Sequence, residues 1–182
     1  MNKFSKKSKT QKLYRFEIDQ SVRIEELNRD STIGIANKDH SYTISLSRRV
    51  KRRLHEHFRR QGKSKQFGPH TFAAGIICAL QEINLAIHDL IIDIEYPGYE
   101  QQIIDLIQIH FPEVTVYFTR VGRKSPAHYA AYGVYIRRRK TDRIASTRDI
   151  LQTLKNGFRT VTPLDKARRF AVHNKPFNRY YN

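Results

Sequence analysis

The spacing of apolar and polar residues along the chain changes from one segment to the next. From Leu13 to Asp19, the even positions are apolar and the odd positions from Arg15 onward are charged. This period of two is typical of a strand with one buried face. Apolar runs over 32–36 and 41–46, separated by turn-forming residues, indicate two more strands joined by a tight hairpin. This part of the chain therefore predicts three consecutive antiparallel strands.

After the third predicted strand, the apolar residues take on helical spacing. Ser47 is a favourable N-cap for a helix over 48–61, in which Val50 begins an apolar line at i, i+4 and i+8. The other sides of this helix are crowded with arginine and lysine. A second helix, predicted over 71–86, is apolar on nearly every side, so we expect it to lie buried against the sheet.

The stretch from Leu90 to Gly98, Leu-Ile-Ile-Asp-Ile-Glu-Tyr-Pro-Gly, has the composition of a buried central strand that closes in a turn. A helix over 99–110 and a strand over 114–119 follow it. Strands joined through a helix favour parallel pairing with a right-handed crossover. We therefore expect these two strands to lie in one sheet.

Two further helices are predicted in the C-terminal part of the chain. Ser125 is placed to cap a short helix over 126–132, with Pro126 at its first position. Basic residues 137–140 indicate a loop. A last helix begins near Ser146, and Gly157 is expected to end it.

These elements predict one α/β domain over residues 13–157. Its mixed five-stranded sheet has three antiparallel strands, followed by alternating helices and strands, with helices on both faces. Residues 1–12 contain five lysines and no acid, which predicts a disordered basic arm. Residues 158–182 are basic and contain aromatic side chains, which predicts a flexible tail.

The composition is strongly basic, with 34 Lys and Arg residues against 17 Asp and Glu and a formal net charge of +17. Such an excess attracts polyanions, so nucleic acid, RNA or DNA, is the expected partner. A membrane partner is not expected, because no apolar run approaches about 18 residues. The single cysteine, Cys78, lies in an apolar helical pattern. Together with the lack of a signal peptide, this favours a reducing, cytoplasmic location.

Two carboxylates interrupt the apolar run over 90–98. A buried, ionised carboxylate without a partner is costly, so Asp93 and Glu95 must be paired, exposed at a strand end, or bound to a cation. Being two residues apart on a strand, they point to the same face. No lysine or arginine lies between Gln66 and Thr119. This distribution suits a carboxylate site inside a basic rim, and it equally suits internal salt bridges.

Four short stretches carry a family resemblance. Phe16-Glu17-Ile18-Asp19-Gln20-Ser21 is an apolar strand with an aspartate followed, after one residue, by a small polar residue. The run over 90–98 supplies a second strand with acids, and Glu56 lies on the first helix. Lys124-Ser125-Pro126-Ala127-His128 opens a late helix. With the order of elements, these stretches resemble the ribonuclease H-like superfamily of nucleases and resolvases, over roughly residues 13–136.

The resemblance implies a metal-dependent nuclease that hydrolyses phosphodiester bonds of RNA or DNA by a two-metal mechanism. It implies Asp19 and Asp93 as the shared catalytic and metal-binding core, with Glu95 as the second choice after Asp93. Glu56 is a further candidate metal ligand, and His128 is a candidate ligand or proton shuttle. Mg²⁺ or Mn²⁺ is the implied cofactor, because hard cations prefer carboxylate and water oxygens.

Basic residues outside the middle of the chain are the candidates for phosphate contact, which gives salt-sensitive affinity for any sequence. A non-catalytic protein that binds RNA or DNA through the same fold and a basic surface is the alternative function. Both functions use the same candidate residues. These are Arg49, Arg52, Arg53, Lys63, Arg123, Lys124, Arg138 and Arg139.

Overall fold

The computed structural model of the protein describes residues 12–159. The predicted basic arm and tail therefore lie outside the described residues, apart from Lys12 and the end of the last helix. Within the described range, six strands form one mixed sheet in the order β5-β4-β1-β2-β3-β6. The strands are β1 (Tyr14–Gln20), β2 (Ser31–Ala36), β3 (Ser41–Leu46), β4 (Ile87–Asp93), β5 (Thr115–Thr119) and β6 (Arg143–Ile144).

The strand pairing agrees with the sequence pattern in most respects. β1, β2 and β3 are antiparallel neighbours. β4 pairs in parallel with β1, and β5 pairs in parallel with β4. The sequence predicts five strands, whereas the structure adds a sixth, β6, parallel to β3. With two residues, β6 is too short to produce a period-two pattern.

Helical segments follow β3, β4, β5 and β6, and three helices differ from their predicted bounds by more than one residue. α2 (Phe67–Leu80) ends six residues before the predicted bound of 86. It begins earlier than expected, because Pro69 lies in its first turn, where a missing N–H costs no helical hydrogen bond. α4 is about one turn longer than predicted, and α5 continues through Gly157. The segments are α1 (Arg48–Arg60), the 3-10 helix η1 (Ser64–Gln66), α2 (Phe67–Leu80), α3 (Glu100–His110), α4 (Pro126–Tyr135) and α5 (Thr147–Arg159).

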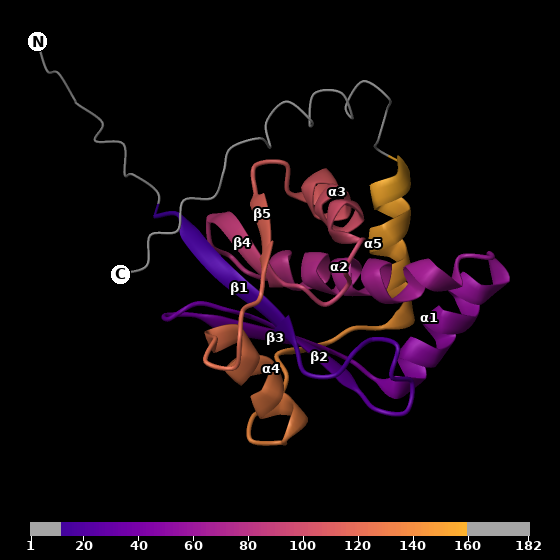
Figure 1. The fold of residues 1–182 in the computed structure, drawn as a ribbon, viewed down its shortest axis with the longest axis horizontal. Helices are drawn as coiled ribbons and strands as arrows, with labels where there is room; N and C mark the ends of the chain where they lie inside the picture. Colours follow the sequence, from indigo (N-terminus) through magenta and orange to yellow (C-terminus); the bar gives the residue numbers. More distant parts are fainter. Residues whose placement is uncertain (1–11, 160–182) are drawn as a thin grey trace, which may run out of the picture.

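Helices cover both faces of the sheet, as predicted. Ile33 and Gly34 are adjacent in β2 and therefore point to opposite faces. A Cβ atom at Gly75 of α2 would lie 2.5 Å from Ile33 Cδ1, and one at Gly34 would lie 2.4 Å from the carbonyl oxygen of Ala127 in α4. α2 and α4 thus pack on opposite faces. Figure 1 shows α3 and α5 on the same side as α2.

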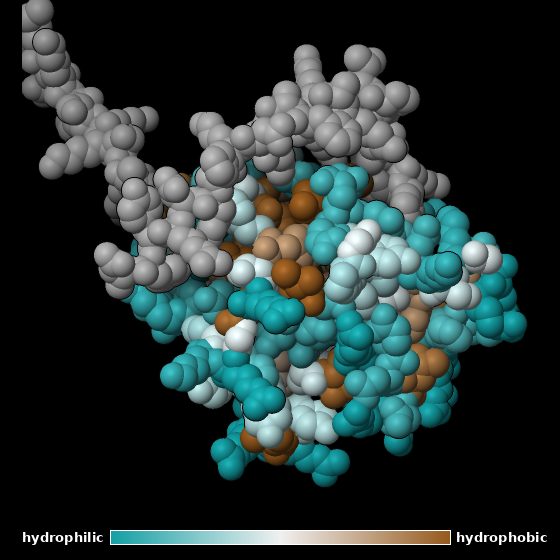
Figure 2. Space-filling view, in the orientation of Figure 1, coloured by the Kyte–Doolittle hydropathy of each residue, from teal (hydrophilic) through white to brown (hydrophobic). Residues whose placement is uncertain are grey.

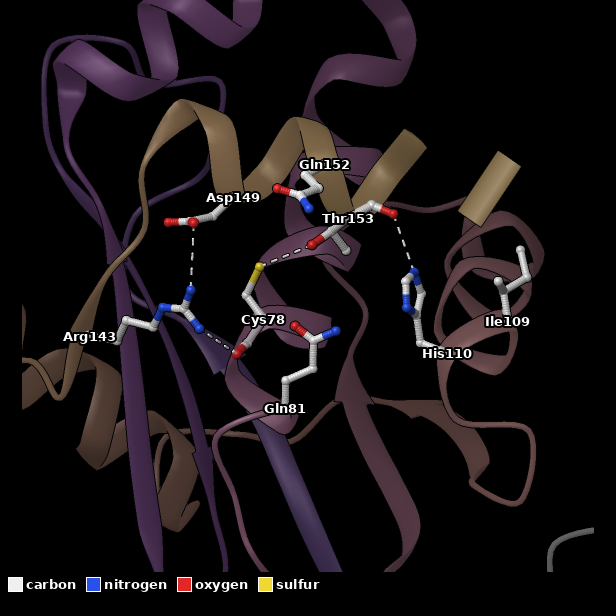
Figure 3. Close-up of a pocket in the computed structure, with 8 residues that line it drawn as sticks. All are labelled: Cys78, Gln81, Ile109, His110, Arg143, Asp149, Gln152 and Thr153. Carbon is white, nitrogen blue, oxygen red and sulfur yellow. Dashed lines mark hydrogen bonds and ion pairs between the residues drawn. The ribbon is translucent and has the colours of Figure 1, made fainter. Parts of the chain in front are cut away.

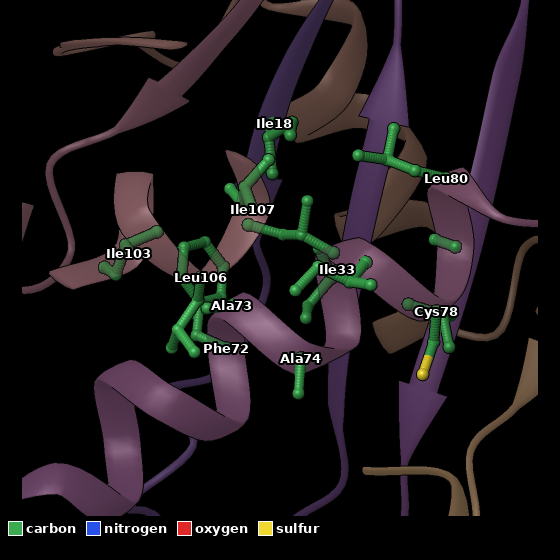
Figure 4. Close-up of a cluster of buried hydrophobic side chains, with 14 of the residues drawn as sticks. Ile18, Ile33, Phe72, Ala73, Ala74, Cys78, Leu80, Ile103, Leu106 and Ile107 are labelled. Carbon is green, nitrogen blue, oxygen red and sulfur yellow. The ribbon is translucent and has the colours of Figure 1, made fainter. Parts of the chain in front are cut away.

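The main hydrophobic core lies on the α2 side of the sheet. All 14 residues of α2 are buried, as its all-round apolar pattern predicts. Figure 4 shows side chains of α2, such as Phe72, beside Leu106 and Ile107 of α3 and Ile33 of β2. Burial of each large apolar side chain contributes about 1.5–3 kcal/mol, so this layer fixes the sheet on which the acids stand.

Lys51 departs from the exposed basic surface that the sequence suggests for α1. Its side chain is fully buried, and its ammonium group donates to Ser31 Oγ at 2.6 Å and to the carbonyl oxygens of Glu26 at 2.8 Å and Arg23 at 3.2 Å. Burial lowers the pKa of Lys51 to about 8. These bonds fasten the loop between β1 and β2 to α1.

Candidate functional site

Two acids lie at one edge of the sheet because β1 and β4 are parallel neighbours. Asp19 is the next-to-last residue of β1, and Asp93 is the last residue of β4. Ile18 pairs with Ile92 in the register, so each aspartate stands one residue further along its strand. The carboxyl ends of parallel strands share an edge, and the two side chains meet there.

Glu95 lies at the same edge of the sheet as the two aspartates, but it is held there by a turn and not by the predicted strand. The sequence predicts a strand from residue 90 that closes in a turn at Pro97-Gly98, but β4 ends at Asp93. The backbone N–H of Glu95 donates to the carbonyl oxygen of Asp93 at 2.9 Å, an i+2 hydrogen bond that turns the chain. Glu95 therefore joins the acids through a turn, and strand alternation does not set its direction.

Asp19, Asp93 and Glu95 form the carboxylate group of the site. Each offers a carboxylate oxygen, and these oxygens all lie within 4.8 Å of one another. Asp19 is buried, whereas Asp93 and Glu95 are partly exposed. This separation is short enough for one divalent cation to contact all three residues.

Hydrogen bonds hold both aspartates in place. Asp19 Oδ1 accepts from the backbone N–H of Gln20 at 2.7 Å, and Asp19 Oδ2 lies 2.8 Å from His128 Nδ1. Asp93 Oδ1 accepts from the backbone N–H of Val121 at 2.7 Å. Because a carboxylate accepts hydrogen bonds, we assign a hydrogen to Nδ1 of His128.

The close approach of α4 to the sheet brings His128 to Asp19. Ser125 caps α4 as predicted, its Oγ accepting from the N–H groups of Ala127 at 3.1 Å and His128 at 3.4 Å. The same hydroxyl donates to Glu17 Oε2 of β1 at 2.6 Å. Gly34 lets the backbone of α4 lie against β2, since a Cβ there would clash. Gly34 and the Ser125 cap thus position α4 so that His128 points toward Asp19.

The surroundings of Asp19 and Glu95 raise the pKa of both carboxyl groups. Burial raises the pKa of Asp19, and the charge of Asp93 adds to this rise, while the hydrogen bond to His128 opposes it. Burial also raises the pKa of Glu95, with the charges of Asp19 and Asp93 adding to the effect. Burial is thus the largest cause of both pKa shifts, and the neighbouring carboxylates add to it.

Two interactions of the site do not follow from the sequence pattern. Arg23, in the loop after β1, lies 3.7 Å from Glu95 Oε2 through its Nε and donates to the backbone carbonyl of Glu95. Its position four residues after Asp19, at the same end of β1, is a signal that could have identified it. The Val121 hydrogen bond uses a backbone N–H, which no side-chain pattern reveals.

The structure separates Glu56 from the carboxylate group. Glu56 lies on α1, where its carboxylate accepts from Arg59 and Arg60, each at 2.9 Å. These bonds lower its pKa to about 2. The physical reason is local, since i+3 and i+4 partners on one helix meet readily. Glu56 therefore forms ion pairs on α1, and it is not among the carboxylates that lie within 4.8 Å of one another.

The predicted phosphate-binding residues lie mainly on exposed surface. Arg52 donates to the carbonyl oxygen of Leu27 at 3.1 Å, and Arg139 is held by Asp142 at 2.9 Å. Figure 2 shows hydrophilic side chains over α1 and around α4, whereas hydrophobic ones gather over β5. Arg49, Arg52 and Arg53 lie on α1 and Lys63 lies after it, while Arg123 and Lys124 precede α4, and Arg138 and Arg139 follow it.

A separate hollow of about 300 Å³ lies between α2, α3 and α5 (Figure 3). Cys78 Sγ lies 3.3 Å from Thr153 Oγ1, and burial raises the pKa of the Cys78 thiol. His110 bonds to the carbonyl oxygen of Thr153 at 3.2 Å. Cys78 is thus a packed thiol, as its sequence context indicates. The hollow shares no residue with the carboxylate group.

Comparison of the chain with protein-family models, with curated proteins and with solved structures gave no match. Over residues 12–159, every helix is too short or too polar to cross a membrane. The function is therefore inferred from the residues and their geometry.

Proposed function

We propose that the protein is a metal-dependent nuclease of ribonuclease H-like fold, which hydrolyses phosphodiester bonds of RNA or DNA by a two-metal mechanism. The convergence of Asp19, Asp93 and Glu95 within 4.8 Å carries this proposal. The sheet supports the resemblance, because three antiparallel strands are followed by the parallel strands β4 and β5. Asp19 and Asp93 stand near the ends of the neighbouring strands β1 and β4, and Glu95 lies in the turn after β4.

The donor set suits a hard divalent cation such as Mg²⁺ or Mn²⁺. Asp19, Asp93 and Glu95 would hold it, and a cation would offset both the burial and the neighbouring carboxylates that raise the pKa of Asp19 and Glu95. A bound ion supplies Lewis acidity, which activates water and stabilises charge on phosphate oxygens. Arg23, 3.7 Å from Glu95, offsets part of the charge and positions that carboxylate.

His128 is the candidate for proton transfer. Its Nδ1 faces Asp19, and its side chain is 28% exposed, so the other ring nitrogen, Nε2, is placed to exchange protons with solvent or substrate. The contact between Asp19 Oδ2 and Nδ1 fixes the orientation of the His128 ring. Ser125 fixes the helix start from which His128 projects.

The alternative is a non-catalytic protein that binds RNA or DNA. The hydrogen bonds and ion pair of the acids favour it, since His128, Val121 and Arg23 already supply Asp19, Asp93 and Glu95 with partners. In this alternative the acids stabilise the fold, and the basic surface holds the nucleic acid.

Cleavage assays with Asp19→Asn and Asp93→Asn test the proposal. Each change removes a negative charge with little change of shape. We expect Mg²⁺- or Mn²⁺-dependent cleavage to fall by more than about 100-fold, because several kcal/mol of charge stabilisation are removed. Nucleic-acid affinity without metal is expected to stay within about twofold of the unmodified protein, since the phosphate-binding residues are elsewhere.

Glu56→Gln is the matched control, because it removes a carboxylate that is paired on α1 and is not part of the carboxylate group. It is expected to retain cleavage. Full activity of both aspartate variants would refute the catalytic assignment. Salt-sensitive binding without cleavage of single-stranded, double-stranded, hybrid and branched substrates in Mn²⁺ would support the binding protein instead.

A further inference from the structure

One side of α4 carries a row of rings that begins at the carboxylate group. His128, Tyr132 and Tyr135 follow the spacing i, i+4 and i+7, which places them on one side of the helix. Tyr132 is 44% exposed and Tyr135 is 42% exposed, although aromatic side chains gain from burial. We call these three residues the α4 row. Its first member, His128, lies 2.8 Å from Asp19 Oδ2 through its Nδ1.

The rings of the α4 row are arranged one after another. The His128 and Tyr132 rings are stacked, with centroids 5.7 Å apart and an angle of 10° between their planes. Tyr132 and Tyr135 follow at 6.1 Å and 36°. Exposed ring faces in such a series offer stacking positions to other planar groups, and nucleic-acid bases are planar groups that stack on tyrosine regardless of sequence.

The far end of the α4 row borders a basic hollow of about 550 Å³. Tyr135 lines it together with Arg29, Arg48 and Arg137, and Arg29 donates to the Tyr135 hydroxyl at 3.1 Å. Asp30 is also in the lining, but its carboxylate already accepts from the backbone N–H of Arg48 at 2.7 Å. Arg48 and Arg137, together with Arg29, which is also paired with Glu26, place positive charge beside the exposed ring of Tyr135, a combination that suits a nucleotide.

The hollow also joins the two basic regions of the surface. Arg48 is the first residue of α1, and Arg137 follows the end of α4. From His128 to Tyr135, the helix rises about 10 Å, a distance that about three stacked nucleotides of one strand span. A strand that leaves the carboxylates along the α4 row therefore reaches the arginines of the hollow and then the basic surface of α1.

We propose that the α4 row and the basic hollow bind a single strand of nucleic acid, with unpaired bases on Tyr132 and Tyr135 and phosphates at Arg29, Arg48 and Arg137. Bases inside a duplex are stacked on each other and do not offer their faces to a tyrosine. With respect to the substrate, this inference rests on the proposed nuclease function. It then predicts that the substrate has an unpaired segment next to the cleaved bond.

Binding measured in EDTA tests the inference separately from cleavage. The probes are fluorescein-labelled 12-nucleotide strands of DNA and of RNA and the 12-base-pair DNA duplex of the same sequence, followed by anisotropy. We expect Tyr132→Ala and Tyr135→Ala each to weaken single-strand binding by about 5- to 100-fold. Duplex binding is expected to change by less than about twofold. The DNA and RNA arms show which strand is preferred.

Conservative variants separate stacking from folding. Tyr132→Phe and Tyr135→Phe keep the ring, so affinity is expected to remain within about twofold of the unmodified protein. A 2-aminopurine base in the strand is expected to be quenched by the Phe variants and not by the Ala variants. Tyr129→Ala is the matched control, because Tyr129 is an exposed tyrosine of α4 that meets the His128 ring edge-on, at 6.2 Å and 68°, and is not part of the stacked series. Its affinity is expected to be unchanged.

The outcomes distinguish this inference from the nuclease proposal. Equal affinity for single strand and duplex, or unchanged binding by both Ala variants, would overturn the inference. So would an equal loss of affinity with Tyr129→Ala. Tyrosine-dependent single-strand binding by a protein that cleaves no substrate would support the inference as a binding surface and remove the nuclease proposal.

Discussion

At the scale of single residues, Lys51 and the acids of the site carry opposite charges, and burial is unfavourable for both kinds of charge. Burial raises the pKa of Asp19 and Glu95 and lowers the pKa of Lys51. In each case, burial disfavours the charged form. The acids have neighbours of like charge that a cation can relieve, whereas Lys51 is held by neutral oxygen atoms. The lysine therefore has a structural role and the acids have a candidate chemical one.

Lys51 makes the stability of the fold depend on pH in a defined interval. Its pKa is about 8 in the folded protein and 10.5 for an unperturbed lysine, so the unfolded chain binds more protons between these values. The free energy of unfolding should therefore rise from about pH 8 to about pH 10.5, by about 3 kcal/mol from this group. We expect Lys51→Met to lack this rise. Urea unfolding at several pH values measures it.

The difference between the unmodified protein and Lys51→Met isolates Lys51, because every other titrating group is present in both. Parallel curves of unfolding free energy against pH would contradict the assignment. Lys51→Arg would be a poor control, since a guanidinium stays charged throughout this interval and is larger than the space that holds the ammonium group.

At the scale of elements, the position of α4 depends on Gly34. A Cβ at this position would lie 2.4 Å from the carbonyl oxygen of Ala127 and 2.9 Å from the N atom of Ala131. Both are backbone atoms of α4, so Gly34→Ala should push the helix outward. We expect the free energy of unfolding to fall by about 1–3 kcal/mol and Mn²⁺-dependent cleavage to fall with it, because His128 moves away from Asp19. Urea unfolding and cleavage assays measure the two effects.

Gly133→Ala is the matched control for Gly34→Ala. It adds the same methyl group within α4, where the nearest atoms are in the flexible side chain of Arg139, at 3.4 Å. Alanine favours a helix over glycine by up to about 1 kcal/mol. We therefore expect unchanged or increased stability, and an equal loss of stability in both variants would contradict the packing argument.

Elements with a complete local signal could be predicted from the sequence. Ser47 and Ser125 cap α1 and α4 as expected, because a serine next to a helical apolar pattern forms its own hydrogen bonds with the first turn. The start of α2 could not be predicted, since Pro69 resembles a loop residue. β6 was missed because its pairing with β3, rather than its own two residues, makes it a strand.

The part of the site that could be predicted from the sequence is the part that depends on neighbouring parallel strands ending at the same edge of the sheet. Asp19 and Asp93 follow from this rule, whereas Glu95 depends on a turn after β4. Glu56 does not join the carboxylate group, because position along a helix does not determine which side faces the sheet, and Glu56 pairs with Arg59 and Arg60 instead. Lys51 shows the same limit, because one buried lysine cannot be distinguished within a run of basic residues.

At the scale of the whole molecule, the excess positive charge predicts how binding depends on salt. The logarithm of affinity for a single strand should fall linearly with the logarithm of salt concentration, by about 0.7 per phosphate neutralised. We expect the double variant Arg49→Ala/Arg53→Ala to lower this slope by about 0.7 for each phosphate that it no longer neutralises. Arg59→Ala, whose guanidinium is paired with Glu56, should change it less. Anisotropy titrations in KCl measure the slopes.

The central position of β1 has a consequence for synthesis of the chain. Its antiparallel neighbour β2 follows soon after it, but Arg15 of β1 and its partner Asp89 of β4 are 74 residues apart. A growing chain that ends before Ile87 therefore presents one edge of β1 with its N–H and C=O groups exposed, an edge to which other strands can bind. The arrival of β4 protects this edge and, in the same event, brings Asp93 to Asp19. Protection from misassembly and formation of the carboxylate group are one step of folding.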